Sequence, residues 1–424
     1  MTWDEFYYLF FYQDKLFIFY ILLVSLLIVF FIFKKNIFSI FDPLNILLLN
    51  VTSCITLILY LKFKGLVENK IFYQIAFINL SFLIFLKLFL IKIKKVKNKK
   101  IKNKIFFNLF YYIHLSCFCI TLFSYVYYIG LSSLENKLIA FQGIGLLAYF
   151  SKIIFPGQII ITLIKRNIYK NKSILDYGIL LIIFFLFFIS GGKTAVITYC
   201  LYFSYLYYIF YENQINLKFL KNKKKEKIIL IFSIFSVIVL FKYYDRNLSI
   251  SELIDRIYFR IISTGDIYYM IYPKNNFNKL DGIPLLDYYL YSFIRPILKK
   301  ILDYTQPILG IEIMKKIFNN NIIGGPNSRA DVVLQMNIGY FGVIFSVFNS
   351  FIIAKIRKVI FLNFLNLYII SIIFVNIEYV ILDFQYFAFY IFALFLVLSP
   401  IYLLTLIIYN ILKFKERNED NLFL

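Results

Sequence analysis

The sequence predicts an all-α protein that crosses a membrane many times, with about eleven transmembrane helices and one large external loop containing short helices. Of its 424 residues, 61% are hydrophobic and 16% are charged. Apolar runs of about 20 residues recur along the chain, and each is long enough to cross about 30 Å of hydrocarbon. A transmembrane β-barrel would show short alternating segments instead. The chain is therefore expected to be a polytopic integral membrane protein.

Hydropathy divides the chain into three parts. Residues 1–244 hold spans one to eight, 245–330 form the large external loop with amphipathic helices, and 331–424 hold spans nine to eleven and a tail. The predicted spans are 16–33, 44–61, 71–91, 105–130, 138–164, 174–190, 194–211, 228–244, 331–354, 359–377 and 386–411. The first run follows acidic residues and precedes Lys34 and Lys35, so we expect an uncleaved signal anchor with its N-terminus outside.

Basic residues gather between spans and predict the orientation. The basic segments are KIKKVKNKKIKNK at 92–104, KRNIYKNK at 165–172, LKFLKNKKKEK at 217–227, KIRK at 355–358 and KFKER at 413–417. Counting spans puts all of them on one side, which the positive-inside rule identifies as the cytoplasm. The net charge of +23 is thus explained by orientation and by contact with anionic membrane lipids, and no nucleic-acid partner is expected.

Cysteine and histidine usage argues against several site classes. Cys54, Cys117, Cys119 and Cys200 all fall within predicted spans, where they are expected to pack rather than form disulfides or bind metal. His114 is the one histidine, so a histidine-rich metal site or a Ser-His-Asp triad is not expected. We expect His114 to have a core or cavity-lining role, and we predict no metal and no other cofactor.

The stretch FFISGGKTAVITYCLYF at 187–203 contains Gly191-Gly192-Lys193-Thr194, which is similar to the end of a phosphate-binding loop. A Walker loop requires glycine five residues before the second glycine, and Phe187 occupies that place. The turn falls on the external side of the predicted topology, away from cytoplasmic nucleotides. Lys193 would then lie where lipid headgroups and lipid diphosphates lie. It would either bind a diphosphate or simply extend to lipid phosphates.

Arginine is concentrated in the external loop of a chain that otherwise favours lysine. Residues 249–271 predict an amphipathic helix with Ser249 and Ser251 as N-cap candidates and with Arg256 and Arg260 on one face. The planar guanidinium suits phosphate, so a diphosphate between these two cations is the functional interpretation. The alternatives are a structural pair with Asp255, or a solvated loop with ordinary ion pairs.

Further polar residues are candidates for a site. Arg329 and Asp331 lie in the first turn of the span at 331–354. Within that span Gly339 and Gly342 would allow a helix or ligand to approach closely.

Three more charged residues lie near predicted span centres or ends. Lys152 lies mid-span beside the Pro156-Gly157 break, where it would either line a cavity or pair with a carboxylate. Glu378 and Asp383 fall at the external end of the last helix pair.

The chain resembles bacterial O-antigen polymerases, also called oligosaccharide repeat-unit polymerases. Three segments carry the resemblance: FFISGGKTAVITYCLYF, where the family more often has arginine than Lys193; DRIYFRIISTGDIYYM at 255–270; and GGPNSRADVVLQMNIGYFG at 324–342. It extends over most of the chain, although the motifs are loose. It implies an inner-membrane protein whose large loop is periplasmic.

The resemblance also implies an activity and its residues. The enzyme would be a metal-independent glycosyltransferase that polymerises undecaprenyl-diphosphate-linked oligosaccharides into O-antigen or capsule-type polysaccharide. A chain-length regulator protein would be a partner. Lys193, Arg256, Arg260 and Arg329 would bind the diphosphate, Asp331 and Asp266 would be the candidate general bases, and Lys152 and Arg295 would line the cavity.

Two other functions remain open at this stage. An O-antigen ligase would have the same architecture and would transfer the glycan to lipid A core. A lipid-linked oligosaccharide flippase or other transporter would favour two similar halves and charges inside the bundle. The sequence shows no internal repeat, and most of its charge other than lysine falls in the predicted external segments, which disfavours the transporter.

The predicted topology can be tested with reporter fusions. Fusions after residues 100, 220 and 415 should report the cytoplasm, and fusions near 280 should report the periplasm, because the lysine-rich loops are retained inside. A cytoplasmic signal at 280 would contradict the assignment of every external site residue.

Overall fold

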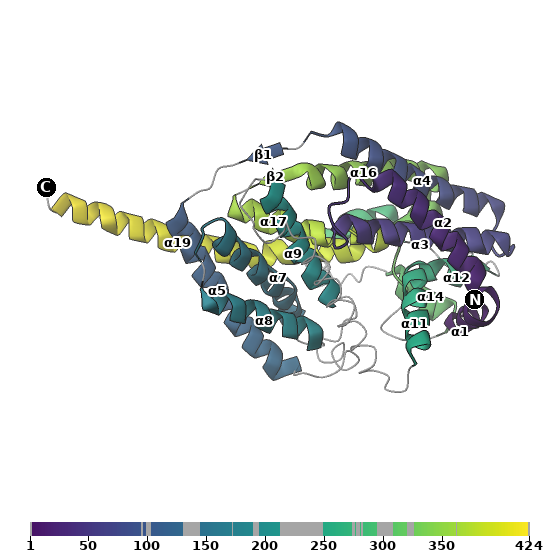
Figure 1. The fold of residues 1–424 in the computed structure, drawn as a ribbon, viewed down its shortest axis with the longest axis horizontal. Coiled ribbons are helices and arrows are strands. Elements are labelled where there is room, and N and C mark those ends of the chain that lie inside the picture. The colour runs from purple at the N-terminus through teal and green to yellow at the C-terminus, as the bar shows by residue number, and fades with distance from the viewer. Residues whose placement is uncertain are drawn as a thin grey trace. The chain divides into compact units, whose positions relative to one another are not determined.

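A computed structural model describes the chain over residues 2–94, 96–98, 103–129, 145–171, 173–189, 195–212, 249–273, 276, 280, 283–294, 308–319, 326–361 and 363–422. Over these residues the protein is almost entirely helical, which confirms the predicted class (Figure 1). The chain forms two compact units. The first comprises Met1–Lys95, Asn247–Lys358 and Asn376–Phe389, and the second comprises Val96–Arg246, Val359–Val375 and Tyr390–Leu424.

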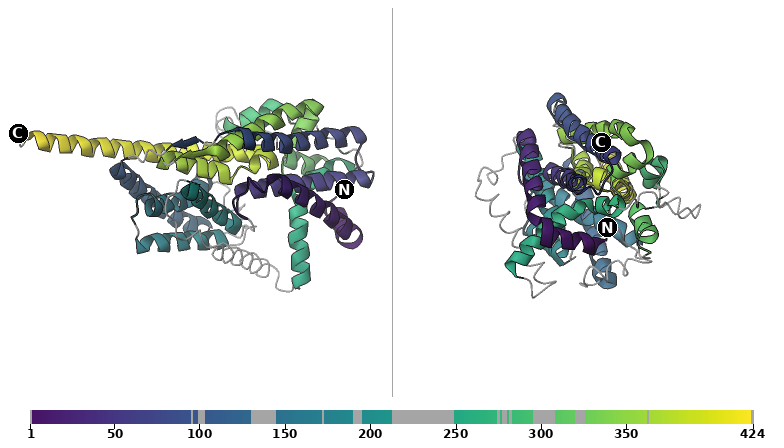
Figure 2. Two further views of the ribbon diagram at one scale, coloured as in Figure 1. Left: turned by 45° about the horizontal axis from the view of Figure 1, so that its top comes forward. Right: turned by 90° about the vertical axis from the view of Figure 1, so that its right-hand side faces the viewer.

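The first unit brings the N-terminal helices together with segments from late in the chain. Its elements are α1 (Trp3–Tyr8), the π-helix η1 (Leu9–Asp14), α2 (Lys15–Phe33), α3 (Pro43–Phe63), α4 (Asn69–Lys92), α11 (Ile250–Ile262), the 3₁₀ turn η2 (Ser263–Gly265), α12 (Asp266–Ile271), the π-helix η4 (Asp287–Tyr291), α14 (Leu309–Lys316), α15 (Ala330–Ile338), the 3₁₀ turn η5 (Gly339–Phe341), α16 (Gly342–Lys358) and α18 (Tyr379–Leu382). Ser249 and Glu252 form a capping box that begins α11, which confirms the predicted N-cap. Figure 2 shows α11 projecting from the neighbouring helices.

The second unit holds the middle helices and most of the last one. Its elements are β1 (Val96–Asn98), α5 (Lys104–Ile129), α7 (Gly145–Asn167), α8 (Ile174–Ile189), α9 (Ala195–Glu212), β2 (Val359–Phe361) and α17 (Phe364–Val375), together with most of α19 (Phe384–Leu422). The strands β1 and β2 pair in parallel, with Val96 opposite Val359. β1 lies within the basic segment at 92–104, and β2 directly follows the one at 355–358. The short sheet itself was not predicted.

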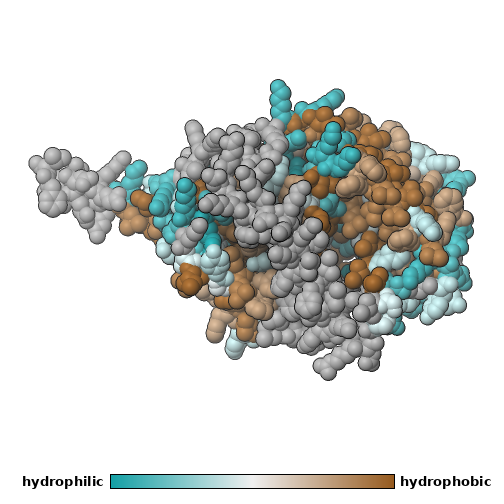
Figure 3. All heavy atoms as spheres, in the orientation of Figure 1, coloured by the Kyte–Doolittle hydropathy of each residue, from teal (hydrophilic) through white to brown (hydrophobic). Residues whose placement is uncertain are grey.

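By length and composition, six helical stretches could cross a membrane: Asp4–Phe33, Pro43–Phe63, Asn69–Lys92, Lys104–Tyr128, Ala330–Lys358 and Phe384–Phe414. Of these, Ala330–Lys358 comprises α15, η5 and α16 and is not one continuous helix. All six cover predicted spans, whereas the predicted span at 228–244 lies outside the described residues. Figure 3 shows apolar side chains over much of the described surface around α2 and α4. Exposed residues such as Tyr20, Ile28 and Ile84 contribute to it, as expected for helices that face lipid.

Contacts within the first unit agree with the predicted order of spans. At one end, Asp14 accepts a hydrogen bond from Tyr60 at 2.7 Å and pairs with Lys64 at 2.8 Å. At the other end, Arg357 pairs with Asp42 at 2.7 Å. The first set joins segments predicted to be external, and the second joins segments predicted to be cytoplasmic.

The stretch at 330–358 differs from the single span that the sequence predicts. Asp331 contacts Asn79 and Gln335 contacts Gln74, so α15 runs opposite to α4. Ser350 then bonds the Phe82 carbonyl, so α16 runs in the same direction as α4. The chain therefore reverses between α15 and α16.

Two glycines make this reversal possible. Gly339 has φ 56° and ψ −123°, which glycine adopts without strain. A Cβ on Gly342 would lie 3.0 Å from the Leu334 Cβ, eight residues earlier, whereas a continuous helix would separate such positions by about 12 Å. The same Cβ would lie 2.7 Å from Ile78 Cδ1 on α4, which confirms the predicted close helix approach.

The core of the second unit contains a polar network around His114. Its Nδ1 lies 2.8 Å from Gln158 Oε1 and its Nε2 lies 3.1 Å from the Tyr368 hydroxyl. These side chains are buried, which agrees with the expected core role of His114. The expected break at Pro156 does not occur, because α7 continues through it. Gly157 instead makes room for the Tyr368 ring: a Cβ there would lie 2.0 Å from the hydroxyl oxygen.

A methyl group at Gly157 should therefore be destabilising. Gly157→Ala would displace the rigid Tyr368 ring from His114, and overpacking of this kind costs roughly 1–3 kcal/mol. Gly178→Ala in α8 is the matched control, because a Cβ there meets nothing within 4 Å. Thermal unfolding in detergent should show a lower midpoint for Gly157→Ala and an equal or higher one for Gly178→Ala. Equal midpoints for Gly157→Ala and the wild type would refute the packing argument.

Candidate functional site

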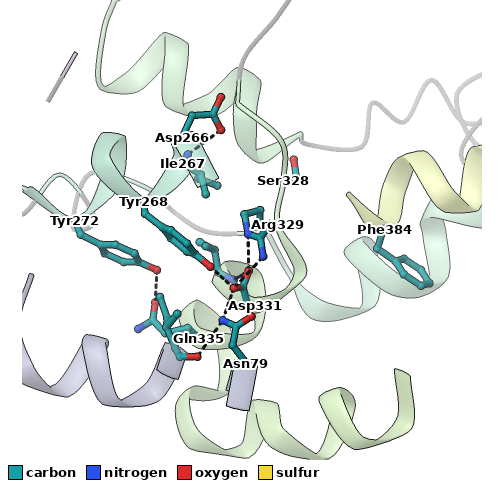
Figure 4. A network of polar contacts seen from close by, with 12 residues as sticks. Asn79, Asp266, Ile267, Tyr268, Tyr272, Ser328, Arg329, Asp331, Gln335 and Phe384 are labelled. Atoms are coloured by element: carbon teal, nitrogen blue, oxygen red, sulfur yellow. Dashed lines mark hydrogen bonds and ion pairs between the residues drawn. The ribbon is translucent and has the colours of Figure 1, made fainter. Parts of the chain in front are cut away.

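A buried ion pair joins Arg329 and Asp331 in the first unit (Figure 4). Arg329 Nε donates to Asp331 Oδ1 at 3.1 Å, and Nη2 donates to Oδ2 at 3.4 Å. Arg329 is 0% exposed and Asp331 is 3% exposed. The two side chains therefore form a bidentate pair that is shielded from solvent.

Helices that are distant in sequence hold this pair. The Tyr268 hydroxyl of α12 and Asn79 Nδ2 of α4 both donate to Asp331 Oδ2, the latter at 2.8 Å. The Val332 backbone N–H donates to Oδ1 at 3.1 Å. Gln335 extends the network by donating to Gln74 at 3.0 Å. The carboxylate thus receives donors from three helices.

The site lies level with the middle of α3 and α4 rather than with their ends. Asn79 is near the midpoint of α4. A Cβ on Gly265, which precedes α12, would lie 2.7 Å from Leu57 Cδ1 and 3.2 Å from Cys54 Sγ, both near the middle of α3. The η2 turn and α12, which belong to the predicted external loop, therefore pack into the helical core beside α3.

Arg329 has donor capacity that Asp331 does not use. Its Nη1 atom is buried and has no hydrogen-bond partner among the residues that the structure describes. Its guanidinium carbon lies 5.5 Å from the centroid of the Tyr268 ring. A buried N–H without an acceptor costs about 1–3 kcal/mol. The geometry thus presents a fixed cationic donor that an anionic oxygen would satisfy.

The two candidate bases differ in their surroundings. Both Asp331 oxygens accept hydrogen bonds, which suits Asp331 to holding Arg329 in place rather than to accepting a proton. Asp266 accepts hydrogen bonds from backbone N–H groups, that of Ile267 at 2.9 Å and its own. Its carboxyl group is enclosed even though the residue as a whole has some exposed surface.

Burial raises the pKa of Asp266 to about 7, and the Ile267 N–H, Arg260 and Arg329 oppose that rise. A carboxyl group that titrates near neutral pH suits general-base chemistry. Asp266 is therefore the stronger candidate base of the two.

The two arginines of α11 are exposed and lie outside the buried pair. Arg256 and Arg260 share one face, as predicted. Asp255, the predicted structural partner, pairs with Lys15 at 2.6 Å. Arg260 nevertheless acts electrostatically on Asp266, which places it toward the buried site.

The remaining predicted site residues are not brought to this centre. Lys193 and Arg295 lie outside the described residues. Lys152 belongs to the second unit, where its Nζ lies 5.7 Å from the centroid of the Tyr390 ring. Within the described ranges, no group of three or more His, Cys, Asp or Glu side chains is arranged to hold a metal ion.

The sequence analysis missed several members of the network. Asn79 and Gln74 were counted as parts of an apolar span, and Tyr268 was quoted without a role. The signal was present, because an amide side chain in a long apolar helix requires a polar partner. The partner itself could not be identified without the reversal of α15.

Comparisons of the chain with protein-family models, with curated proteins and with solved structures return no match.

Removing the counter-charge of Arg329 should strongly destabilise the first unit. Asp331→Asn leaves a buried guanidinium uncompensated, so the free energy of unfolding should fall by about 3–5 kcal/mol. Asp255→Asn is the matched control, since its pair with Lys15 is partly exposed and should contribute about 0–1 kcal/mol. Chemical unfolding in detergent measures both variants. A loss for Asp331→Asn no larger than that for the control would contradict the structural role assigned to Asp331.

Proposed function

We propose that this protein is an inner-membrane glycosyltransferase that polymerises undecaprenyl-diphosphate-linked oligosaccharide repeat units into O-antigen or capsule-type polysaccharide at the periplasmic face. The observation that carries the proposal is Arg329, a buried cation fixed by Asp331 with Nη1 left without a partner in the described structure. An ionisable residue inside a bundle of apolar helices is by default a candidate for function.

The proposed reaction makes two demands on the protein. The bond between the anomeric carbon of the growing chain and its lipid diphosphate breaks, and the diphosphate leaves with the bonding electrons. A hydroxyl of the incoming lipid-linked repeat forms the new bond and loses its proton. The site must therefore stabilise negative charge on the diphosphate and accept a proton from the hydroxyl.

The described residues are suited to both demands. Arg329 would donate from Nη1 to a diphosphate oxygen, and its fixed orientation avoids reorganisation as charge develops. Asp266 would accept the hydroxyl proton, because its pKa near 7 leaves part of it ionised at neutral pH. Arg260, Arg256 and Lys193 would complete the binding of the diphosphate. Asp331 would position Arg329.

The proposal includes the eleven-span topology and the external position of the site. The six apolar stretches and the convergence of predicted cytoplasmic segments at Asp42 and Arg357 support it. The deep position of the Arg329 site implies that the diphosphate enters the bundle rather than resting on a surface loop.

Arginine substitutions test the proposal against a matched control. Arg329→Lys should reduce polymer formation by roughly 10²–10³-fold, since a point charge cannot both keep the bidentate pair and reach the diphosphate. Arg357→Lys alters another buried Arg–Asp pair of the same unit and should leave polymerisation unchanged at equal abundance. Glycan ladders made from lipid-linked repeats measure the effect. Normal ladders with folded Arg329→Lys protein would refute the proposed site.

The pH profile tests the role of Asp266 separately. If Asp266 is the base, the rate should rise with pH through about 7 as the carboxyl group ionises. Asp266→Asn should remove both the activity and this rise. A folded Asp266→Asn protein with an unchanged profile would exclude Asp266 as the base without excluding the role of Arg329.

A further inference from the structure

Glu378 is a second enclosed carboxyl group in the first unit. It lies in the turn Asn376–Glu378 that precedes α18. Asn50 Nδ2, on buried α3, donates to Glu378 Oε2 at 2.7 Å. Asn50 lies in the first half of α3, well before its end at Phe63. The turn that carries Glu378 therefore packs against the body of α3.

No positive charge compensates Glu378 within the described structure. Two described effects act on the ionisation of Glu378: burial disfavours its charged form, and the hydrogen bond from the neutral Asn50 amide favours it. On α15, which packs against α18, the charged residues Arg329 and Asp331 are paired with each other. On its own segment, Asp383 has the same sign. An enclosed carboxylate with one neutral donor is costly, so the neutral form is favoured.

A bound metal cation is a poor alternative. Asn50 presents its NH2 group to Glu378, so the amide oxygen does not face the same point. The carbonyls of Asn376, Ile377 and Glu378 already accept backbone hydrogen bonds from residues 379–382. Calcium and magnesium require about six or more oxygen ligands, which this turn does not offer. The ligand that the geometry accommodates is a proton.

We propose that Glu378 is a proton-binding site, with the proton on one carboxyl oxygen and the Asn50 hydrogen bond on the other. Burial raises the pKa of Glu378 to about 7, and Asn50 opposes that rise by bonding the ionised form. The site does not depend on the proposed transferase activity.

The position of Glu378 gives its protonation a structural consequence. Six residues later, the Phe384 backbone N–H donates to the Tyr288 hydroxyl at 3.0 Å. That hydroxyl donates to the carbonyl of Ser328, which directly precedes Arg329. A negative charge on Glu378 disfavours packing of its turn against α3. The turn continues directly into the segment whose Phe384 N–H bonds Tyr288. Because packing of the turn depends on pH, the two hydrogen bonds that link Phe384, Tyr288 and Ser328 beside Arg329 depend on pH as well.

Infrared titration of the whole protein in detergent tests the proposal directly. The wild type should show the band of a protonated carboxyl group that disappears with a midpoint near pH 7. Glu378→Gln should remove this component, whereas Asp266→Asn should remove only the separate component that belongs to Asp266. Asn50→Leu should move the Glu378 midpoint to higher pH, because the lost hydrogen bond favoured the ionised form.

Thermal unfolding provides a second readout with a defined sign. The native pKa of Glu378 lies above the unfolded value, so its neutral form is fully favoured at low pH and stability falls as pH rises toward and through about 7. In Glu378→Gln the loss of stability with rising pH should be smaller than in the wild type. In Asp266→Asn the part of that loss that is due to Glu378 should remain. A wild-type spectrum whose protonated carboxyl bands are unaffected by Glu378→Gln would overturn the proposal. If that variant does not fold, an Asn50→Leu titration identical to the wild type would overturn it.

Discussion

The pair between Arg329 and Asp331 is the interaction on which the arrangement of the first unit depends. A guanidinium with 0% exposure requires its counter-ion, and Asp331 in turn requires the donors that surround it. Those donors come from α4 through Asn79 and from α12 through Tyr268. α15 must therefore run back along α4, and η2 with α12 must reach the middle of α3. One charged pair thus brings together segments about 250 residues apart in sequence.

The sequence predicts where helices form better than how they run. Apolar runs of sufficient length locate α3, α4 and α5 closely. Every backbone N–H and C=O group in lipid needs a partner within the same segment, so a long apolar run must be helical along its length. The reversal at Gly339 cannot be predicted in the same way, since hydropathy averages over a window and carries no direction. The Gly339–Gly342 spacing indicated only a close approach. Positive φ at Gly339 and its packing on α4 become visible only once both helices are placed.

The same division applies to the site. Arg329, Asp331 and Asp266 were identified because arginine and carboxylates are unusual in a lysine-rich, apolar chain. Their roles could not be separated, since the difference lies in hydrogen bonds that neighbouring helices supply. Both oxygens of Asp331 accept hydrogen bonds from side chains, two of which belong to neighbouring helices, whereas the described donors to the enclosed carboxyl group of Asp266 are backbone N–H groups. Composition identifies residues that are expensive to bury, and tertiary contacts decide which of them is structural and which can accept a proton.

Other buried ion pairs in the protein show what distinguishes the Arg329 site. Asp42 pairs with Arg357 and also accepts the Leu44 N–H at the start of α3. Asp176 pairs with Lys165 and accepts the Ser173 N–H at the start of α8. Each of these carboxylates caps a helix end, where unsatisfied N–H groups already require an acceptor. Asp331 likewise accepts the Val332 N–H in the first turn of α15, but this helix start lies level with the middle of α3 and α4 rather than with their ends. A charge at that depth is costly, and this position, rather than the ion pair as such, supports the proposed ligand site.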